Sequence, residues 1–488
     1  MKHLLLLVFL FTAITIQAQK KISPVKYASS ITADDLKKHL FIIASAEMEG
    51  RETATEGQRK AAAYIEDHFR KLGLVAPVSG GYQQYYPVYT DTLLDAKVAV
   101  NDVWFNWGKD VSGSLSSLNT QELNFGEFLF LAKGDSTTNI TGKAVILVLP
   151  KTSTRISNAE MMSLLTRSPS LVLAISSGTL PGNGSRMGNM YLNPFRATQS
   201  PTLLYATEAI GKAIMNKDLE AAQKNELSTK KYLTKFSSII KKEIKTLRSS
   251  NVMGLLEGTD KKDEYVVISS HYDHIGKQGA VINFGADDDG SGTVGVLELA
   301  EAFSMAKLEG KGPRRSILFL TVSGEEKGLW GSEYYANNPI FPLDKTTVDL
   351  NIDMIGRIGT DYLSDKDSAN YIYVIGDDKI SSDLMPISDE ANTKYTKIKL
   401  DKKYNDISDP NRFYYRSDHY NFAIKGVPII FYFNGVHKDY HRPTDTPDKI
   451  NYPLMAKRTQ LVFYTALEMA NKEELLKRDI PLQIPPRR

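Results

Sequence analysis

Five apolar runs, each of strand length, recur between residues 264 and 433, with polar loops and helical stretches between them. They cover residues 264–270, 316–322, 347–353, 371–376 and 427–433. The stretch 291–306, between the first two runs, has the apolar pattern of a helix with Ser291 as its N-cap. Apolar strands that alternate with helices are typical of parallel sheets covered by helices on both sides. The sequence therefore predicts an α/β fold with a mixed, largely parallel central sheet.

Side chains that bind metals or move protons follow four of these runs. They are His271, Asp273 and His274 after the first run, Glu325 and Glu326 after the second, Asp353 at the end of the third, and His437 and His441 after the fifth. Open α/β sheets bind ligands at the carboxyl ends of their strands, so we expect these groups at one edge of the sheet. The loop before the predicted helix adds three consecutive carboxylates, Asp287, Asp288 and Asp289.

This concentration of acidic groups indicates a metal site. Each motif alone is typical of a turn or of a structural histidine. Together, however, carboxylates that converge without basic partners repel one another, and buried charges are paired or bind metals. The chain contains no cysteine, so only His, Asp and Glu are available as ligands, and disulfides are excluded. This mixture suits one or two zinc ions, with manganese and cobalt as alternatives.

The composition limits the other functions of the chain. Its 488 residues suffice for two or three domains. The 60 basic residues nearly balance the 57 acidic ones, which does not indicate nucleic-acid binding.

The N-terminus has the pattern of a secretory signal. Residues 1–18 combine Lys2, an apolar run, and small or polar residues around Ala18. A buried strand or an uncleaved anchor is the alternative. No other stretch of the sequence is long and apolar enough to span a membrane. We therefore expect an exported protein, periplasmic or extracellular, without a membrane span after signal removal.

Four further segments follow the predicted signal. Residues 19–95 have helical patterns, and residues 249–475 contain the α/β pattern described above. Residues 96–248 contain short strand-like runs, such as 127–132, 143–150 and 170–175, and no histidine. We expect this stretch to form a separate β-rich insert. Residues 476–488 are expected to be a loose tail.

The ordered motifs of the C-terminal half resemble one known family. They are "HYDHIG", "GADDDGSG", "SGEEKGLWGSEYYA", "NIDMIGR", "RSDHYNFAIKGVP" and "DYHRPTDT". Their order is similar to that in the di-zinc aminopeptidase and glutamate-carboxypeptidase-like metallopeptidases, and in particular to secreted bacterial members of the aminopeptidase Y type. The resemblance is close from residue 251 to about residue 452, and residues 96–248 resemble the protease-associated domain that many members carry.

The resemblance implies five metal ligands and two Zn²⁺ ions. The ligands are His271, Asp288, Glu326, Asp353 and His441. His271 and Asp353 would hold one ion and Glu326 and His441 the other, with Asp288 as the bridge. Among the three consecutive aspartates, Asp288 is selected by its spacing from the Ser-Gly that follows the bridging residue in the family.

The resemblance also implies a peptidase mechanism. A metal-activated water would hydrolyse the peptide bond, with Glu325 as general base, and the N-terminal residue would be released. Asp273 is expected to orient the His271 ring, because side chains two residues apart on an extended backbone share a face. Arg416, Asp418, His419 and Tyr440 are candidates for substrate binding. His274 and His437 are expected to lie outside the ligand set, and Asp287 and Asp289 to support the loop and cap the helix.

Three alternatives remain open on the sequence alone. A secreted glutaminyl cyclase would share the fold but use one zinc. A carboxypeptidase or dipeptidase of the same superfamily would act on other peptides at the same site. A non-catalytic binding protein would have lost ligands, although none of the five is missing here. The preferred peptide substrate and the oligomeric state stay unassigned.

Overall fold

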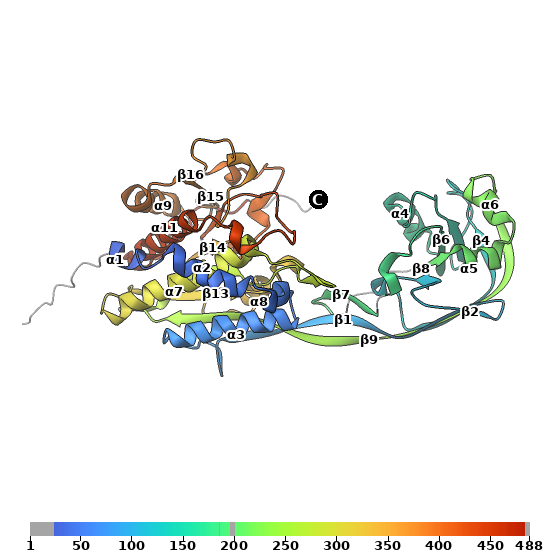
Figure 1. Cartoon of the computed structure of the whole chain (residues 1–488), viewed down its shortest axis with the longest axis horizontal. Coiled ribbons are helices and arrows are strands. Elements are labelled where there is room, and N and C mark those ends of the chain that lie inside the picture. The colour runs from blue at the N-terminus through green and yellow to red at the C-terminus, as the bar shows by residue number, and fades with distance from the viewer. Residues whose placement is uncertain (1–23, 185, 196–200, 484–488) are drawn as a thin grey trace, which may run out of the picture. The chain divides into compact units, whose positions relative to one another are not determined.

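The computed structural model describes residues 24–184, 186–195 and 201–483 (Figure 1). The predicted signal segment, residues 1–18, and the last five residues of the predicted tail lie outside this range. The described chain divides into two compact units, one of residues 24–84 with 250–483 and one of residues 85–249. The smaller unit begins before the expected residue 96, because strand β1 (Gln83–Val100) is continuous and already pairs with β7 (Met187–Tyr191) of that unit at Tyr89.

The larger unit is built on a mixed sheet with the strand order β16-β15-β17-β14-β10-β13-β9. Its strands are β10 (Lys261–His271), β13 (Arg315–Val322), β14 (Thr346–Ile352), β15 (Tyr371–Ile375), β16 (Lys399–Asp401), β17 (Ile429–Phe433) and the C-terminal part of β9 (Lys230–Leu256). The four central strands β17, β14, β10 and β13 are parallel. The outer strands β9 and β15 run antiparallel to β13 and β17. All five predicted strands are present, and the predicted α/β class is confirmed.

Helices cover both faces of this sheet (Figure 1). One core contains the alternate strand residues Val266, Ile268 and Phe319, together with apolar residues of α2 (Ala33–Ile43), α3 (Glu56–Lys71), α7 (Gly292–Leu308), α9 (Leu384–Ala391) and α11 (Tyr452–Asn471). The opposite core contains Val267 and Leu318 with residues of α8 (Trp330–Asn337) and α10 (His419–Ala423). Successive side chains of a strand point to opposite faces, and both faces are buried here, which is why the strands are apolar throughout.

The start of α7 differs from the prediction that Ser291 is the N-cap. Ser291 has helical backbone angles and makes no capping hydrogen bond. Instead, the carboxylate of Asp289 accepts the N–H of Gly292 at 2.8 Å. The capping group therefore comes from the acidic loop, where a carboxylate also interacts favourably with the positive end of the helix dipole.

In the smaller unit the strand order is β9-β4-β5-β6-β8-β3, and the long strand β9 is common to the strand order of both units. Its elements include β2 (Val103–Phe105), β3 (Val111–Ser112), β4 (Gln121–Phe130), β5 (Ala144–Val148), β6 (Leu171–Ser176), β8 (Thr202–Thr207), α4 (Asn158–Arg167), α5 (Glu208–Met215) and α6 (Asp218–Gln223). Two apolar clusters form its core. Over the described part of the chain, no helix combines the length and the apolar character needed to cross a bilayer.

Candidate active site

The predicted metal-binding side chains meet at the carboxyl edge of the larger unit's sheet. His271 is the last residue of β10, and Asp353 follows directly after β14. Glu325 and Glu326 open a short helical turn that begins three residues after β13. His441 lies in the loop that follows β17. The parallel run of these four strands is what carries residues from distant parts of the sequence to one place.

Asp288 lies between two groups of potential ligands. Its Oδ1 is 3.3 Å from Nε2 of His271, and its Oδ2 is 3.0 Å from Nε2 of His441. On the first side, Asp353 Oδ1 is 3.7 Å from His271 Nε2. On the second side, Glu326 Oε2 is 3.1 Å from His441 Nε2. All five residues that the resemblance implied as ligands are therefore in contact, in the pairs that it implied.

The donor atoms fit a metal shell. Donors at about 2.0–2.1 Å from a tetrahedral zinc ion lie roughly 3.3 Å from one another, close to the separations found here. In addition, His271 Nε2, Asp288 Oδ2 and Glu326 Oε1 are buried and make no hydrogen bond of good geometry, although ring nitrogens of His441 and His274 lie 3.0 and 2.7 Å from the two carboxylate oxygens. Buried polar atoms without a partner are costly in a folded protein, and a bound cation would satisfy all three.

The neighbours of Asp288 have the structural roles expected for them. Asp287 accepts the N–H of Gly356 at 2.7 Å, and Asp289 accepts the N–H of Gly292 at 2.8 Å. Both carboxylates thus fasten the loop to backbone groups around it. Only Asp288 directs its carboxylate at the two histidines.

The electrostatics of the group favour positive charge. Burial opposes ionisation of Asp288, but His271 and His441 outweigh it and hold the pKa of this carboxyl well below its ordinary value. Burial likewise disfavours a charged His441 ring, yet Asp288 and Glu326 raise its pKa to about 10. A site that stabilises a proton this strongly attracts a divalent cation for the same reason.

Asp273 acts differently from the expectation. The Nδ1 atom of His271 is 3.1 Å from the backbone carbonyl of Asp273 but 3.7 Å from its carboxylate, which is too far for a hydrogen bond. The carboxylate instead accepts the hydroxyl of Thr53 at 2.7 Å and the N–H of Glu325 at 3.3 Å. The main chain of Asp273 therefore orients the imidazole, and its side chain positions the turn that carries the two glutamates.

The two adjacent glutamates have different surroundings. The side chain of Glu326 is 4% exposed and contacts His441 through Oε2. The side chain of Glu325 is 14% exposed, and its Oε2 is 3.9 Å from His271 Nε2. Glu325 also lines the adjoining pocket. One carboxylate thus belongs to a ligand group, while the other faces the space in front of it.

Two further histidines lie near the group. His437 Nε2 is 3.1 Å from Asp287 Oδ2, so it supports the loop, consistent with the expectation that it is not a ligand. His274 Nδ1 is 2.7 Å from Glu326 Oε1. It was expected to lie outside the ligand set, yet it directly contacts one predicted ligand. With Asp288 and Glu326 it forms another group of potential metal ligands, a role that the sequence did not suggest.

The pocket in front of the group is lined by six apolar or aromatic residues and four charged ones. Its lining residues are Asp288, Glu325, Asp353, Met354, Phe413, Arg416, Phe431, Phe433, Val436 and Tyr440. Tyr440 reaches the pocket, as expected, and stacks on the His441 ring at 3.9 Å.

Asp418 and His419 are fully buried beneath the pocket and do not line it. Asp418 accepts a hydrogen bond from Ser332, and His419 Nε2 is 2.8 Å from the carbonyl of Tyr414. Their placement gives them a supporting position rather than the substrate contact that was expected.

Some residues of the site were missed by sequence reasoning. Arg51 is completely buried and braces the loops around His271 and Asp288. Ser417 donates a 2.6 Å hydrogen bond to Asp353 Oδ2. Phe431 and Phe433 lie in a predicted strand. They are two residues apart and therefore on the same face of that strand, which was the available signal. Phe413 begins a three-residue 3-10 helix (Phe413–Tyr415), which is too short to show a periodic pattern that would have identified it.

A sheet with buried His–carboxylate groups at its carboxyl edge defines a metal-binding α/β protein of the zinc-exopeptidase type. Residues 251–466 match Peptidase family M28, and this part of the chain belongs to that family.

Curated relatives match parts of the chain. A probable leucine aminopeptidase of Arthroderma otae is 31% identical over 220 residues, which are 43% of this chain and 55% of that protein. A probable glutamate carboxypeptidase of Arabidopsis thaliana is 34% identical over 104 residues, which are 21% of this chain and 14% of that protein. The chain thus spans about half the length, 55%, of the leucine aminopeptidases it matches.

Solved structures share the fold. An aminopeptidase from Aneurinibacillus sp. strain AM-1 aligns with a TM-score of 0.54 at 20% identity, over 96% of this chain and 100% of that chain. A zinc aminopeptidase from Bacillus subtilis aligns with a TM-score of 0.51 at 18% identity, over 92% and 99% of the two chains. At these identities the likeness concerns the fold.

Proposed function

We propose that the protein is an exported, zinc-dependent aminopeptidase that releases N-terminal residues from peptides. The observation that carries this proposal is the position of Asp288, whose two carboxylate oxygens face two separate His–carboxylate groups. Membership of residues 251–466 in Peptidase family M28 supports the peptidase class.

The five clustered residues are the proposed zinc ligands. His271 and Asp353 would hold one ion, Glu326 and His441 the second, and Asp288, which lies between the two pairs, would contribute to both. Bound zinc would supply a Lewis acid for the scissile carbonyl and a water molecule with a pKa of about 7.

Glu325 is the proposed general base. It faces the pocket beside His271, so it can take a proton from the attacking water and pass it to the leaving amine. Burial holds the pKa of its carboxyl well above the ordinary value, which suits a group that both accepts and returns a proton. Asp273 supports this role by binding the Glu325 backbone N–H.

The pocket favours an apolar residue at the substrate's N-terminus. Met354, Phe413 and Phe433 provide contact surface for a hydrophobic side chain. The relatives that are named leucine aminopeptidases agree with this preference. The test is hydrolysis of leucyl, glutamyl and lysyl peptides by the zinc-loaded protein, with the leucyl peptide cleaved fastest. Equal rates on all three would contradict the preference.

Arg416 supports a second candidate, a carboxypeptidase or dipeptidase. Its guanidinium lines the same pocket and is a suitable anchor for a free carboxylate. Peptides with free or acetylated N-termini separate the two functions. An aminopeptidase requires the free amine, whereas a carboxypeptidase cleaves the acetylated peptide as well.

Peptide assays also distinguish a cyclase and a binding protein from a peptidase. An N-terminal glutamine peptide that loses ammonia without cleavage would identify a glutaminyl cyclase. A zinc-loaded protein that changes none of the peptides would identify a binding protein.

Export and the identity of the insert are part of the same proposal. The pattern of residues 1–18 supports export to the periplasm or the medium, with a mature chain that begins near Gln19. Cell fractionation and N-terminal mass spectrometry test this. The unit of residues 85–249 is proposed to be the protease-associated-like domain, and the peptide assays, repeated on a chain without it, test its effect on substrate choice.

A further inference from the structure

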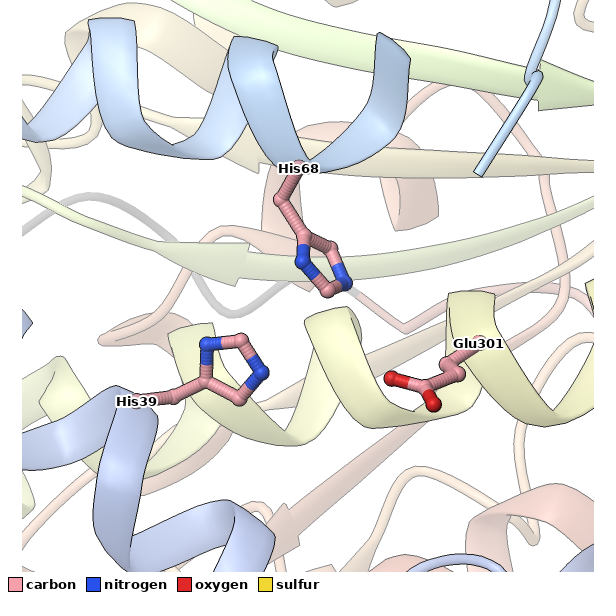
Figure 2. A group of neighbouring side chains, drawn as sticks. All are labelled: His39, His68 and Glu301. Atoms are coloured by element: carbon pink, nitrogen blue, oxygen red, sulfur yellow. The ribbon is translucent and has the colours of Figure 1, made fainter. Parts of the chain in front are cut away.

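A second group of potential metal ligands lies on the helices of the larger unit, apart from the residues of the candidate active site. His39 belongs to α2, His68 to α3 and Glu301 to α7. One donor atom from each lies within 4.8 Å of the other two. Figure 2 shows the three side chains pointing toward one another from three different helices. Residues so distant in the sequence meet here only because α2, α3 and α7 pack together.

A fourth side chain lies beside the group, next to His39. Glu298 is one turn before Glu301 on α7, and its side chain is only 2% exposed. Its Oε1 is 3.5 Å from Nε2 of His39. That separation is close to the roughly 3.3 Å between neighbouring donors of a tetrahedral zinc ion.

Two donor atoms of the group are buried without a hydrogen-bond partner. They are Oε1 of Glu298 and Nε2 of His68. Most buried polar atoms in folded proteins have a partner, because leaving one unpaired is costly. Two such atoms in one cluster indicate that something else satisfies them.

Each of the two rings has a hydrogen-bond partner outside the cluster. Nδ1 of His39 is 2.7 Å from the hydroxyl of Tyr64, and the His68 ring is hydrogen-bonded to the backbone of Leu297. When Nδ1 donates to such a partner, Nε2 keeps its lone pair for a metal, which is how histidine ligands are usually fixed. The two rings meet edge to face, 4.8 Å apart.

The charge balance also favours a cation. Glu298 and Glu301 are one turn apart on the same helix, where two like charges repel. The neighbouring Lys38 is already paired with Asp35 at 2.7 Å.

We propose that His39, His68, Glu298 and Glu301 form a structural zinc site that fastens α2, α3 and α7 to one another. Two imidazoles and two carboxylates are a suitable set for a closed tetrahedral zinc site, which has no open position for catalysis. Metal bound there stabilises the folded chain, because the site exists only when the three helices are packed.

Zinc stoichiometry tests the site. The full-length protein is equilibrated with excess Zn²⁺, separated from free metal, and its zinc per chain is counted by elemental mass spectrometry. We expect the His68→Gln/Glu301→Gln double variant to hold one zinc fewer than the parent and to hydrolyse the leucyl peptide at the parental rate. Asp67→Asn, an exposed change next to His68, is the matched control and should keep the parental count.

The test does not depend on how many zinc ions the candidate active site binds, because it compares the zinc count of the variant with that of the parent. Equal zinc counts in the double variant and the parent would overturn the proposal. If the double variant does not fold, anomalous diffraction from crystals of the zinc-loaded parent replaces it. A zinc peak between α2, α3 and α7 is expected, and its absence would mean that the cluster is only a polar contact between helices.

Discussion

The buried guanidinium of Arg51 donates a 2.7 Å hydrogen bond to the carbonyl oxygen of Tyr272, the residue that follows His271. Its other donors bind the carbonyls of Ile43, Phe284 and Gly285, each at 2.8 Å. One planar group thus holds both the strand end that carries His271 and the loop that carries Asp288. An ammonium group has three donors and a different geometry, so it cannot satisfy the same four acceptors.

We therefore expect Arg51→Lys to lower the free energy of unfolding by about 2–4 kcal/mol and to weaken zinc retention. Denaturant unfolding and a zinc competition assay measure the two effects. Arg59 is exposed and pairs with Glu56. Arg59→Lys is therefore the control and should change the free energy of unfolding by less than about 0.5 kcal/mol. A variant as stable as the parent would show that Arg51 does not organise the site.

The different surroundings of the two glutamates predict different defects. Glu325→Gln should keep the zinc content and lower kcat about 10²–10⁴-fold, because only the proton-transferring group is lost. Glu326→Gln should instead weaken zinc binding, and high zinc should partly restore its activity. Zinc counts and kcat, measured on both variants, separate the roles. Near-full activity of Glu325→Gln would rule out the general-base assignment.

Metal removal should abolish activity reversibly. A chelator takes away the proposed Lewis acid and leaves the carboxylates of Asp288, Glu326 and Asp353 in mutual repulsion. We expect lost turnover, a lower unfolding midpoint, and recovery of both on adding Zn²⁺. Mg²⁺ prefers an all-oxygen shell and should not restore activity. Unchanged peptide hydrolysis in a metal-free preparation would contradict the proposed chemistry.

Asp349 predicts a pH dependence of stability. It is completely buried on β14, and burial, opposed by the hydroxyl of Ser269, raises its pKa to about 8. The folded state therefore keeps this proton up to about pH 8, whereas the unfolded chain releases it near pH 4. The contribution of Asp349 to the free energy of unfolding is therefore fully present below about pH 4 and is lost as the pH rises toward 8.

Asp349→Asn removes that titration. Between pH 5 and 8 the stability of the variant, relative to the parent, should rise by up to about 1.4 kcal/mol per pH unit. Urea unfolding at several pH values measures the difference. Stability curves that run parallel over this range would show that Asp349 does not titrate there.

The position of Arg416 predicts how the protein recognises the C-terminal carboxylate of a short peptide. If its guanidinium binds a substrate carboxylate, Arg416→Met should raise KM for a dipeptide with a free C-terminus by about 10–100-fold and leave the amidated dipeptide unaffected. If both substrates respond equally, the side chain only shapes the pocket. Matched kinetics on the two dipeptides distinguish these results.

The sheet and the gathering of His and carboxylate side chains at its edge were predictable because their signals are local. Each strand shows as an apolar run, and the chemistry follows the strand ends, where parallel strands of an α/β sheet present ligands. The motif order then related His271, Glu326 and Asp353 to a known family, to which residues 251–466 belong.

The supporting contacts were not predictable in the same way. Asp273 was expected to orient His271 through its carboxylate, but the backbone carbonyl does so, because the chain leaves the extended form after β10. His274 was set aside, yet it contacts Glu326. These contacts depend on the conformation of loops, which the periodicity of side chains in the sequence does not predict.

The sequence by itself determined the fold class, the order of the motifs and the types of ligand available, since these depend on periodicity and residue chemistry along the chain. Only the tertiary structure decided which atoms meet. Arg51 reaches carbonyls more than two hundred positions away, at Phe284 and Gly285. His39, His68 and Glu301 form a cluster through the packing of three helices. Contacts of this kind arise when separate elements pack against one another, and no local pattern in the sequence predicts them.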